Sequence, residues 1–118
     1  MRSFVLLAML LAAAPALAQT KAMPGMAVPS PAGAAPSTIA YQNAMARMDR
    51  GMSIPYTGNA DQDFVAGMIA HHQGAIDMAR VELRYGHDRA LRRLARGIIK
   101  AQTREIAFMR RWQARHPK

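Results

Sequence analysis

Two adjacent histidines, His71 and His72, lie in the middle of the longest helix-like segment of the chain, residues 61–86. Methionines stand on either side of the pair, at Met68 and Met78. Residues of an α-helix advance by about 100° each, so one stripe of this segment holds Phe64, Met68, His72, Ala75, Ala79 and Glu82. We expect this stripe to be buried. Imidazole, thioether and carboxylate groups on one buried face indicate a site for a soft metal ion.

A carboxylate interrupts the apolar stripe of the next segment, residues 89–114. Glu105 stands in the middle of that stripe, whose other members are Leu91, Leu94, Ile98, Ala101, Met109 and Trp112. A buried carboxylate is costly unless it is paired or bound to a metal. In an antiparallel hairpin Glu105 lies level with His72 and Met68. We therefore expect Glu105 to orient a histidine or to bind metal itself, with Met109 beside it.

A first helix, residues 38–51, carries more methionines. Met45 and Met48 share a face with Tyr41 and Met52, at spacings of four, three and four residues. One interpretation is an ordinary apolar stripe filled with methionine; the other is a set of thioether ligands in line with the histidines. The sequence leaves both open.

The chemical types of the candidate ligands indicate which metal the site would prefer. Thioether sulfur favours Cu(I), and imidazole accepts Cu(I), Cu(II) and zinc. A structural zinc site normally uses cysteine, and the chain has none. A di-iron carboxylate bundle needs Glu-x-x-His motifs, which are also missing from the sequence. Copper is the predicted metal, Cu(I) before Cu(II). Without a metal, His72 and Glu105 would form a buried polar pair.

The first part of the chain reads as an export signal and a linker. Arg2, the apolar run 4–14 and the Ala16-Leu17-Ala18 site predict a cleavable leader, residues 1–18. A linker rich in Pro, Ala and Gly follows at residues 19–37. We expect a periplasmic or secreted protein without stable membrane insertion, because no other run reaches the ~20 apolar residues of a membrane span.

The remaining residues, 38–116, predict an all-α domain of three main helices. Ser37 or Thr38 is the expected N-cap of the first helix and Gly51 its end, whereas Asn59 or Asp61 caps the second. Gly86 ends the second helix and Asp88 caps the third, so the two long helices form an antiparallel hairpin behind the short first helix. A homodimer would complete the bundle, since three apolar stripes exceed what a small monomer hides.

The net charge of +9 allows a second reading. Most of the positive charge is predicted on one face of the third helix, which carries Arg89, Arg92, Arg93, Arg96, Lys100, Arg104, Arg110 and Arg111. Export argues against nucleic acid as the partner. The charge either keeps the domain soluble or docks an anionic envelope surface, which makes a non-metal interaction module the alternative function. No nucleophile, oxyanion site or substrate pocket can be read, so an enzyme is not expected.

The run DFVAGMIAHHQGAIDMA, the turn Gly86-His87-Asp88, the run LRRLARGIIKAQTREIAFM and Trp112 resemble the DUF305 family of exported bacterial proteins, and in particular its CopM-like copper-binding members. The resemblance implies a ferritin-like helical bundle. It also implies periplasmic copper binding through Met and His, contributing to copper tolerance. The positions that match the family are Met45, Met48, Met68, His71, His72, Met78, Glu105 and Met109.

Overall fold

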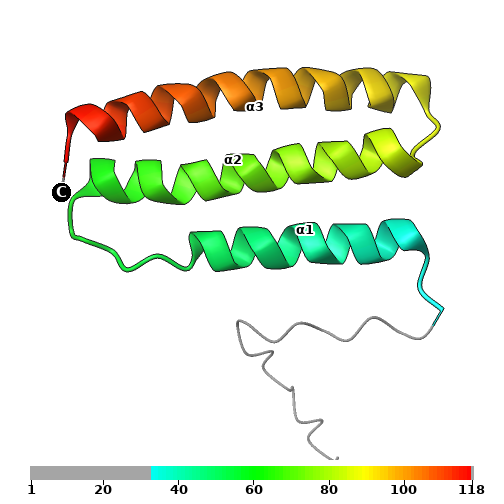
Figure 1. Ribbon diagram of the computed structural model, residues 1–118, viewed down its shortest axis with the longest axis horizontal. Helices are drawn as coiled ribbons and strands as arrows, with labels where there is room; N and C mark the ends of the chain where they lie inside the picture. The colour runs from blue at the N-terminus through cyan, green and yellow to red at the C-terminus, as the bar shows by residue number, and fades with distance from the viewer. Residues whose placement is uncertain (1–32, 118) are drawn as a thin grey trace, which may run out of the picture.

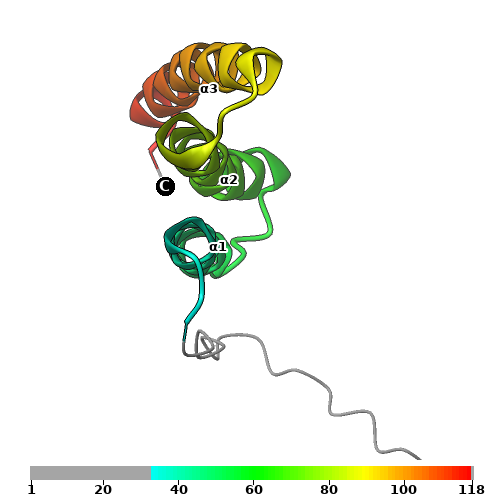
Figure 2. The same ribbon diagram turned by 90° about the vertical axis from the view of Figure 1, so that its right-hand side faces the viewer.

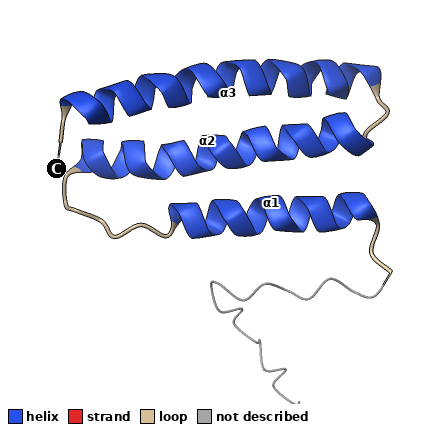
Figure 3. Cartoon of the chain, in the orientation of Figure 1, coloured by secondary structure: helices blue, strands red, loops and turns tan. Residues whose placement is uncertain are grey.

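The computed structural model describes residues 33–117 and contains three helices, α1 (Pro36–Met52), α2 (Ala60–Tyr85) and α3 (Arg89–Arg115). Within these residues there is no strand (Figure 3). The expected leader 1–18, and residues 19–32 of the expected linker, lie outside the described residues. The prediction of an all-α domain with a short helix and a long hairpin is confirmed. No helix of residues 33–117 combines the length and apolar character that crossing a bilayer requires.

The three helices form an open layer with α2 in the middle. Both α1 and α3 run antiparallel to α2 (Figure 1), and the end-on view shows them on opposite sides of it (Figure 2). Contacts join α2 to α3 and α1 to α2, but α1 and α3 do not touch each other within the described residues. Two sides of α2 are therefore free of helical neighbours in a single copy of the chain.

The ends of α2 and α3 follow from their capping residues. The Asn59 side chain accepts hydrogen bonds from the backbone N–H groups of Asp61 and Gln62. Asp88 accepts from the N–H groups of Ala90 and Leu91, both at 2.8 Å. These bonds satisfy N–H groups that the first turn of a helix leaves without partners. Asn59 is therefore the cap of α2, and the predicted cap of α3 is confirmed.

The start and end of α1 differ from the prediction. The helix begins at Pro36 after Ala35, without a side-chain cap, so neither Ser37 nor Thr38 serves as one. Proline suits the first helical position because its φ is already helical and it has no N–H to satisfy. At the other end α1 continues through Gly51 to Met52, and the Ser53 hydroxyl donates to the Asp49 carbonyl at 2.9 Å.

The core lies between α2 and α3. Its buried members are Val65 and Ile76 from α2 and Ile106 and Met109 from α3, with Met68, Ile69, Ile99 and Trp112 packed against them. The predicted contact face of α3 is wrong over most of its length. Leu94 is 59% exposed and Glu105 is also exposed, whereas Ala95 and Ile106 are buried. Ala95 and Ile106 each follow a predicted residue, which is a turn of up to about 100° at these positions, whereas Met109 of the predicted stripe is buried as expected.

Glycine lets α1 approach α2 closely. A Cβ added at Gly74 would lie 2.9 Å from Met48 Cβ, and one at Gly51 would lie 2.9 Å from Ala70 Cβ. The two helices therefore meet nearly backbone to backbone at these positions. At Gly67, seven residues before Gly74, the approach is looser: an added Cβ would meet only Ile54, at the ordinary distance of 4.0 Å.

One side of the layer carries most of the exposed apolar side chains. We call it the apolar face. Its large members are between 36% and 62% exposed and come from all three helices: Tyr41, Met45 and Met52 of α1, Phe64 and Met78 of α2, and Leu91, Leu94 and Phe108 of α3. At about 100° per residue, the positions of Phe64 and Met78 on α2 fall between the side that contacts α1 and the side that contacts α3. The same residue count along α1 and α3, which run antiparallel to α2, places Met45 and Leu94 on the same side of the layer. The α2 stripe expected to be buried is therefore only partly so, with Phe64 62% exposed.

Candidate metal centre

His72 and Glu105 meet across the antiparallel contact of α2 and α3. His72 Nε2 lies 2.5 Å from Glu105 Oε2. The same alignment holds at the far end of the hairpin, where Gln62 Nε2 donates to the His116 carbonyl at 2.8 Å. The alignment is set by the short turn between Gly86 and Asp88. The predicted placement of Glu105 beside His72 is therefore correct, although its carboxylate is not buried.

The pair leaves one histidine nitrogen without a partner. The side chain of His72 is 10% exposed and that of Glu105 is 59% exposed. A carboxylate only accepts hydrogen bonds, so the proton between the two groups belongs to His72 Nε2. In the neutral ring Nδ1 then carries a lone pair, and this atom is buried with no hydrogen-bond partner. A buried polar atom without a partner costs about 1–3 kcal/mol, and a bound metal ion would remove that cost.

Two methionines lie one helical turn from the pair. Met68 precedes His72 by four residues and Met109 follows Glu105 by four, so they occupy the next level of the same antiparallel contact. Met109 is 6% exposed and belongs to the buried core, and Met68 packs against that core. Two methionine side chains therefore stand one helical turn from the His72–Glu105 pair, toward the N-terminus of α2.

The other predicted ligands lie elsewhere. His71 is exposed, with its ring centroid 6.0 Å from that of His72. Met45 and Met78 belong to the apolar face and are each 39% exposed. Met48 covers Gly74 in the contact between α1 and α2. The eight predicted positions thus divide into a group of four at the α2–α3 contact and four residues outside it.

Glu82 does not oppose Glu105. It lies ten residues beyond His72, about 15 Å along the helix. Its carboxylate folds against Gly86, where a Cβ would collide with it, and its Oε1 is buried without a hydrogen-bond partner. Within residues 33–117 no three His, Asp or Glu side chains gather closely enough to hold a metal ion.

Several polar contacts were not anticipated from the sequence. Arg92 Nη1 donates to the carbonyls of Leu83 and Gly86, at 2.7 and 2.9 Å, so it closes the end of α2 rather than standing on a free basic face. The exposed His116 stacks on Trp112 with ring centroids 4.3 Å apart. Arginine in the first turn after a helix end is the signal that could have identified the Arg92 contact.

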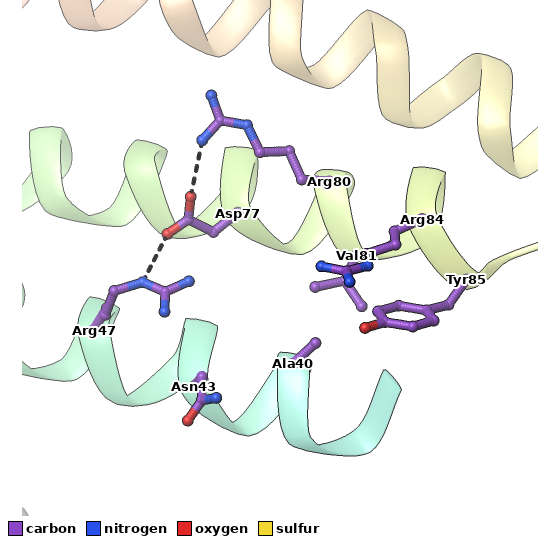
Figure 4. Close-up of a pocket in the computed structure, with 8 residues that line it drawn as sticks. All are labelled: Ala40, Asn43, Arg47, Asp77, Arg80, Val81, Arg84 and Tyr85. Carbon is purple, nitrogen blue, oxygen red and sulfur yellow. Dashed lines mark hydrogen bonds and ion pairs between the residues drawn. The ribbon is translucent and has the colours of Figure 1, made fainter. Parts of the chain in front are cut away.

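The side of the layer opposite the apolar face is charged. Asp77 accepts from Arg47 Nε at 3.2 Å and from Arg80 Nη1 at 3.3 Å, which ties α1 to α2 (Figure 4). These residues line a shallow cavity of about 360 Å³ together with Arg84, whose guanidinium lies 5.2 Å from the Tyr85 ring centroid. No predicted ligand lines this cavity, so the candidate metal centre is separate from it.

Comparison with known protein families gives one match. The model of the family described as "Domain of unknown function (DUF305)" matches residues 9–113. This range contains all three helices up to the last turn of α3. No curated protein matches the chain significantly.

Proposed function

The chain belongs to the DUF305 family, and we propose that it is an exported copper-binding protein that sequesters or carries Cu(I) in the periplasm, or after secretion, and thereby contributes to copper tolerance. The proposal extends to Cu(II) as a second ligand and to a CopM-like role within a ferritin-like bundle. We propose a binding role rather than catalysis.

The observation that carries the proposal is the unpartnered Nδ1 of His72. Glu105 holds the ring from the other nitrogen, which fixes both the tautomer and the orientation of the lone pair. A carboxylate that supports a histidine in this way is the usual outer partner of a metal-bound imidazole.

The neighbouring thioethers favour copper as the metal. Met68 and Met109 stand one helical turn from the pair, and soft thioether ligands favour Cu(I) over magnesium or calcium. His71, Met45 and Met78 are exposed in a single copy and lie outside the α2–α3 contact. We therefore assign retention of copper to the α2–α3 contact.

The test is an anaerobic Cu(I) titration against a chromophoric competitor chelator. The wild-type protein is expected to take Cu(I) from the chelator in stoichiometric amount. His72→Ala should abolish this competition, and Glu105→Gln should weaken it by about 10–100-fold because the ring loses its orienting partner. His87→Ala changes an exposed histidine away from the site and is the matched control.

The methionines are tested separately by replacement with leucine, which nearly conserves volume and so spares the core. Met68→Leu and Met109→Leu should reduce Cu(I) affinity while the helical circular dichroism stays unchanged. Unchanged competition in the His72→Ala variant would refute the proposal, as would failure of the wild-type protein to compete at all.

A second candidate rests on the outer edge of α3. Arg93, Arg96 and Lys100 are exposed there, in a chain of net charge +9. These residues could dock an anionic envelope partner. Reversing the three charges to glutamate should abolish binding to anionic vesicles and leave the copper titration unchanged. Arg92 is left out because its guanidinium holds the end of α2.

A further inference from the structure

The apolar face has the character of an interface. Its eight large side chains come from α1, α2 and α3, and each is at least 36% exposed. Isolated exposed apolar residues are ordinary, but so many on one side of a small domain mark an interaction surface.

A single copy of the chain also fully buries no large apolar side chain among the described residues. Among the described residues no large side chain is less than 2% exposed, and Ala44 is the one apolar residue at 0%. Chains of this size bury little surface and need a further source of stability. The chain has no cysteine, so disulfides cannot provide it. Covering the apolar face would supply the missing burial.

The charge distribution indicates which partner covers the apolar face. The chain carries a net charge of +9, yet helical positions on the apolar side of residues 33–117 hold neither Lys nor Arg. An anionic membrane would attract a face with basic residues along it. Here the basic residues of α3 lie on the outer edge. The carboxylates on the apolar side are Glu105, which is paired with His72, and Glu82, which is half-buried and folded against Gly86. A second identical chain can therefore approach this face without bringing the basic residues of the two copies together.

We propose that the apolar face is the contact surface of a symmetric homodimer. In a two-fold contact the same surface meets itself. Because α2 is the middle helix, such an axis brings the α2 helices of the two copies together, with Ala75 near the centre. Helices α1 and α3 of each copy are then covered by the outer helices of the other. The result is a two-layer bundle of six helices.

The primary test is the mass of the purified full-length protein in solution, measured by light scattering over a range of concentrations with a chelator present. The expected mass is that of two chains. Leu94→Glu and Phe108→Glu change residues that are 59% and 58% exposed in one copy, so each folded monomer should tolerate them. Because the contact is two-fold, each new glutamate would be buried in both copies. We expect the dissociation constant of the dimer to rise by about tenfold or more.

The matched control is Ile39→Glu. Ile39 is 42% exposed on the outer side of α1, away from the apolar face, and its replacement makes the same change in charge. This variant should keep the mass of two chains. Helical circular dichroism is recorded for all three variants, so that loss of fold is not mistaken for dissociation.

A single introduced cysteine gives an independent readout, because the chain has none of its own. Ala75→Cys should form an interchain disulfide under mild oxidation, whereas Arg80→Cys, on the charged side, should not. A one-chain mass at every concentration would overturn the proposal. So would a two-chain mass that survives both glutamate substitutions, or one that is lost when residues 1–32 are removed.

Discussion

The two contacts of α2 are built on opposite principles. Against α3, large side chains interlock, with Val65, Ile76 and Ile106 forming the buried core. Against α1, the backbones approach until Gly74 touches Met48 and Gly51 touches Ala70. One contact gains stability from apolar side-chain area and the other from the absence of a side chain. Truncating a side chain should therefore destabilise the α2–α3 contact most, and adding a side-chain atom should destabilise the α1–α2 contact most.

The largest effect is expected from Ile76→Ala at the α2–α3 contact. Ile76 is 3% exposed and central to the core. Truncating a buried isoleucine costs about 2–5 kcal/mol, from lost transfer energy and the cavity left behind. Urea denaturation at one fixed protein concentration measures the loss. A cost below about 1 kcal/mol, the level of a surface change, would show that this contact is not the main core.

Gly74→Ala tests the α1–α2 contact by addition. The new methyl group would meet Met48, and overpacking of this kind costs about 1–3 kcal/mol. Gly97→Ala is the matched control, because nothing lies within 4 Å of its added Cβ. That substitution should stabilise α3 by up to about 1 kcal/mol, through helix propensity alone. Thermal melts of the two variants should move in opposite directions.

Glu105→Ala removes the single partner of a buried ring. We expect the free energy of unfolding to fall by about 1 kcal/mol, because His72 Nε2 then lacks an acceptor, although water can partly replace an exposed carboxylate. The measurement is urea denaturation beside wild type. Glu105→Gln keeps an acceptor within reach and should recover most of the loss. Equal losses in the two variants would contradict this assignment.

The smallest effect belongs to Arg47→Ala. The Arg47 side chain is 55% exposed, so its ion pair with Asp77 should contribute no more than about 0.5 kcal/mol. Raising the salt concentration should shrink even that difference. A loss comparable to that of Ile76→Ala would mean that α1 is held by charge rather than by close approach, which would reverse the comparison between the two contacts.

The elements that local chemistry controls could be predicted from the sequence. Asp88 and Gly86 fixed the ends of the hairpin, and the hairpin length placed Glu105 beside His72. The rotation of α3 could not be predicted in the same way. Its apolar residues cover two neighbouring stripes, one through Leu94 and one through Ala95, and periodicity does not say which stripe faces α2. Both stripes are apolar, as expected if the stripe through Leu94 is covered by another copy.

The candidate site shows a similar limit. Spacing identified His72, Met68, Glu105 and Met109 as neighbours, because in an antiparallel helix hairpin the number of residues from the turn fixes the position of each side chain along the paired helices. It could not place Met48 or Met45, since their positions depend on how α1 lies against α2. The close approach of the two helices depends on Gly74, which has no side chain, and hydrophobic periodicity does not predict such an approach.

The open order of the helices also sets how the molecule comes apart. Within residues 33–117 of a single copy, helix α1 has α2 as its one helical neighbour, whereas the hairpin of α2 and α3 contains the buried core and the His72–Glu105 pair. Detaching α1 in one copy breaks one contact and leaves the other complete, so α1 behaves as a separate unit of local unfolding. Amide protons of α1 then exchange with solvent through an opening that does not require the hairpin to melt. Met48, which covers Gly74 in the closed form, becomes accessible in that opened form while His72 stays in place.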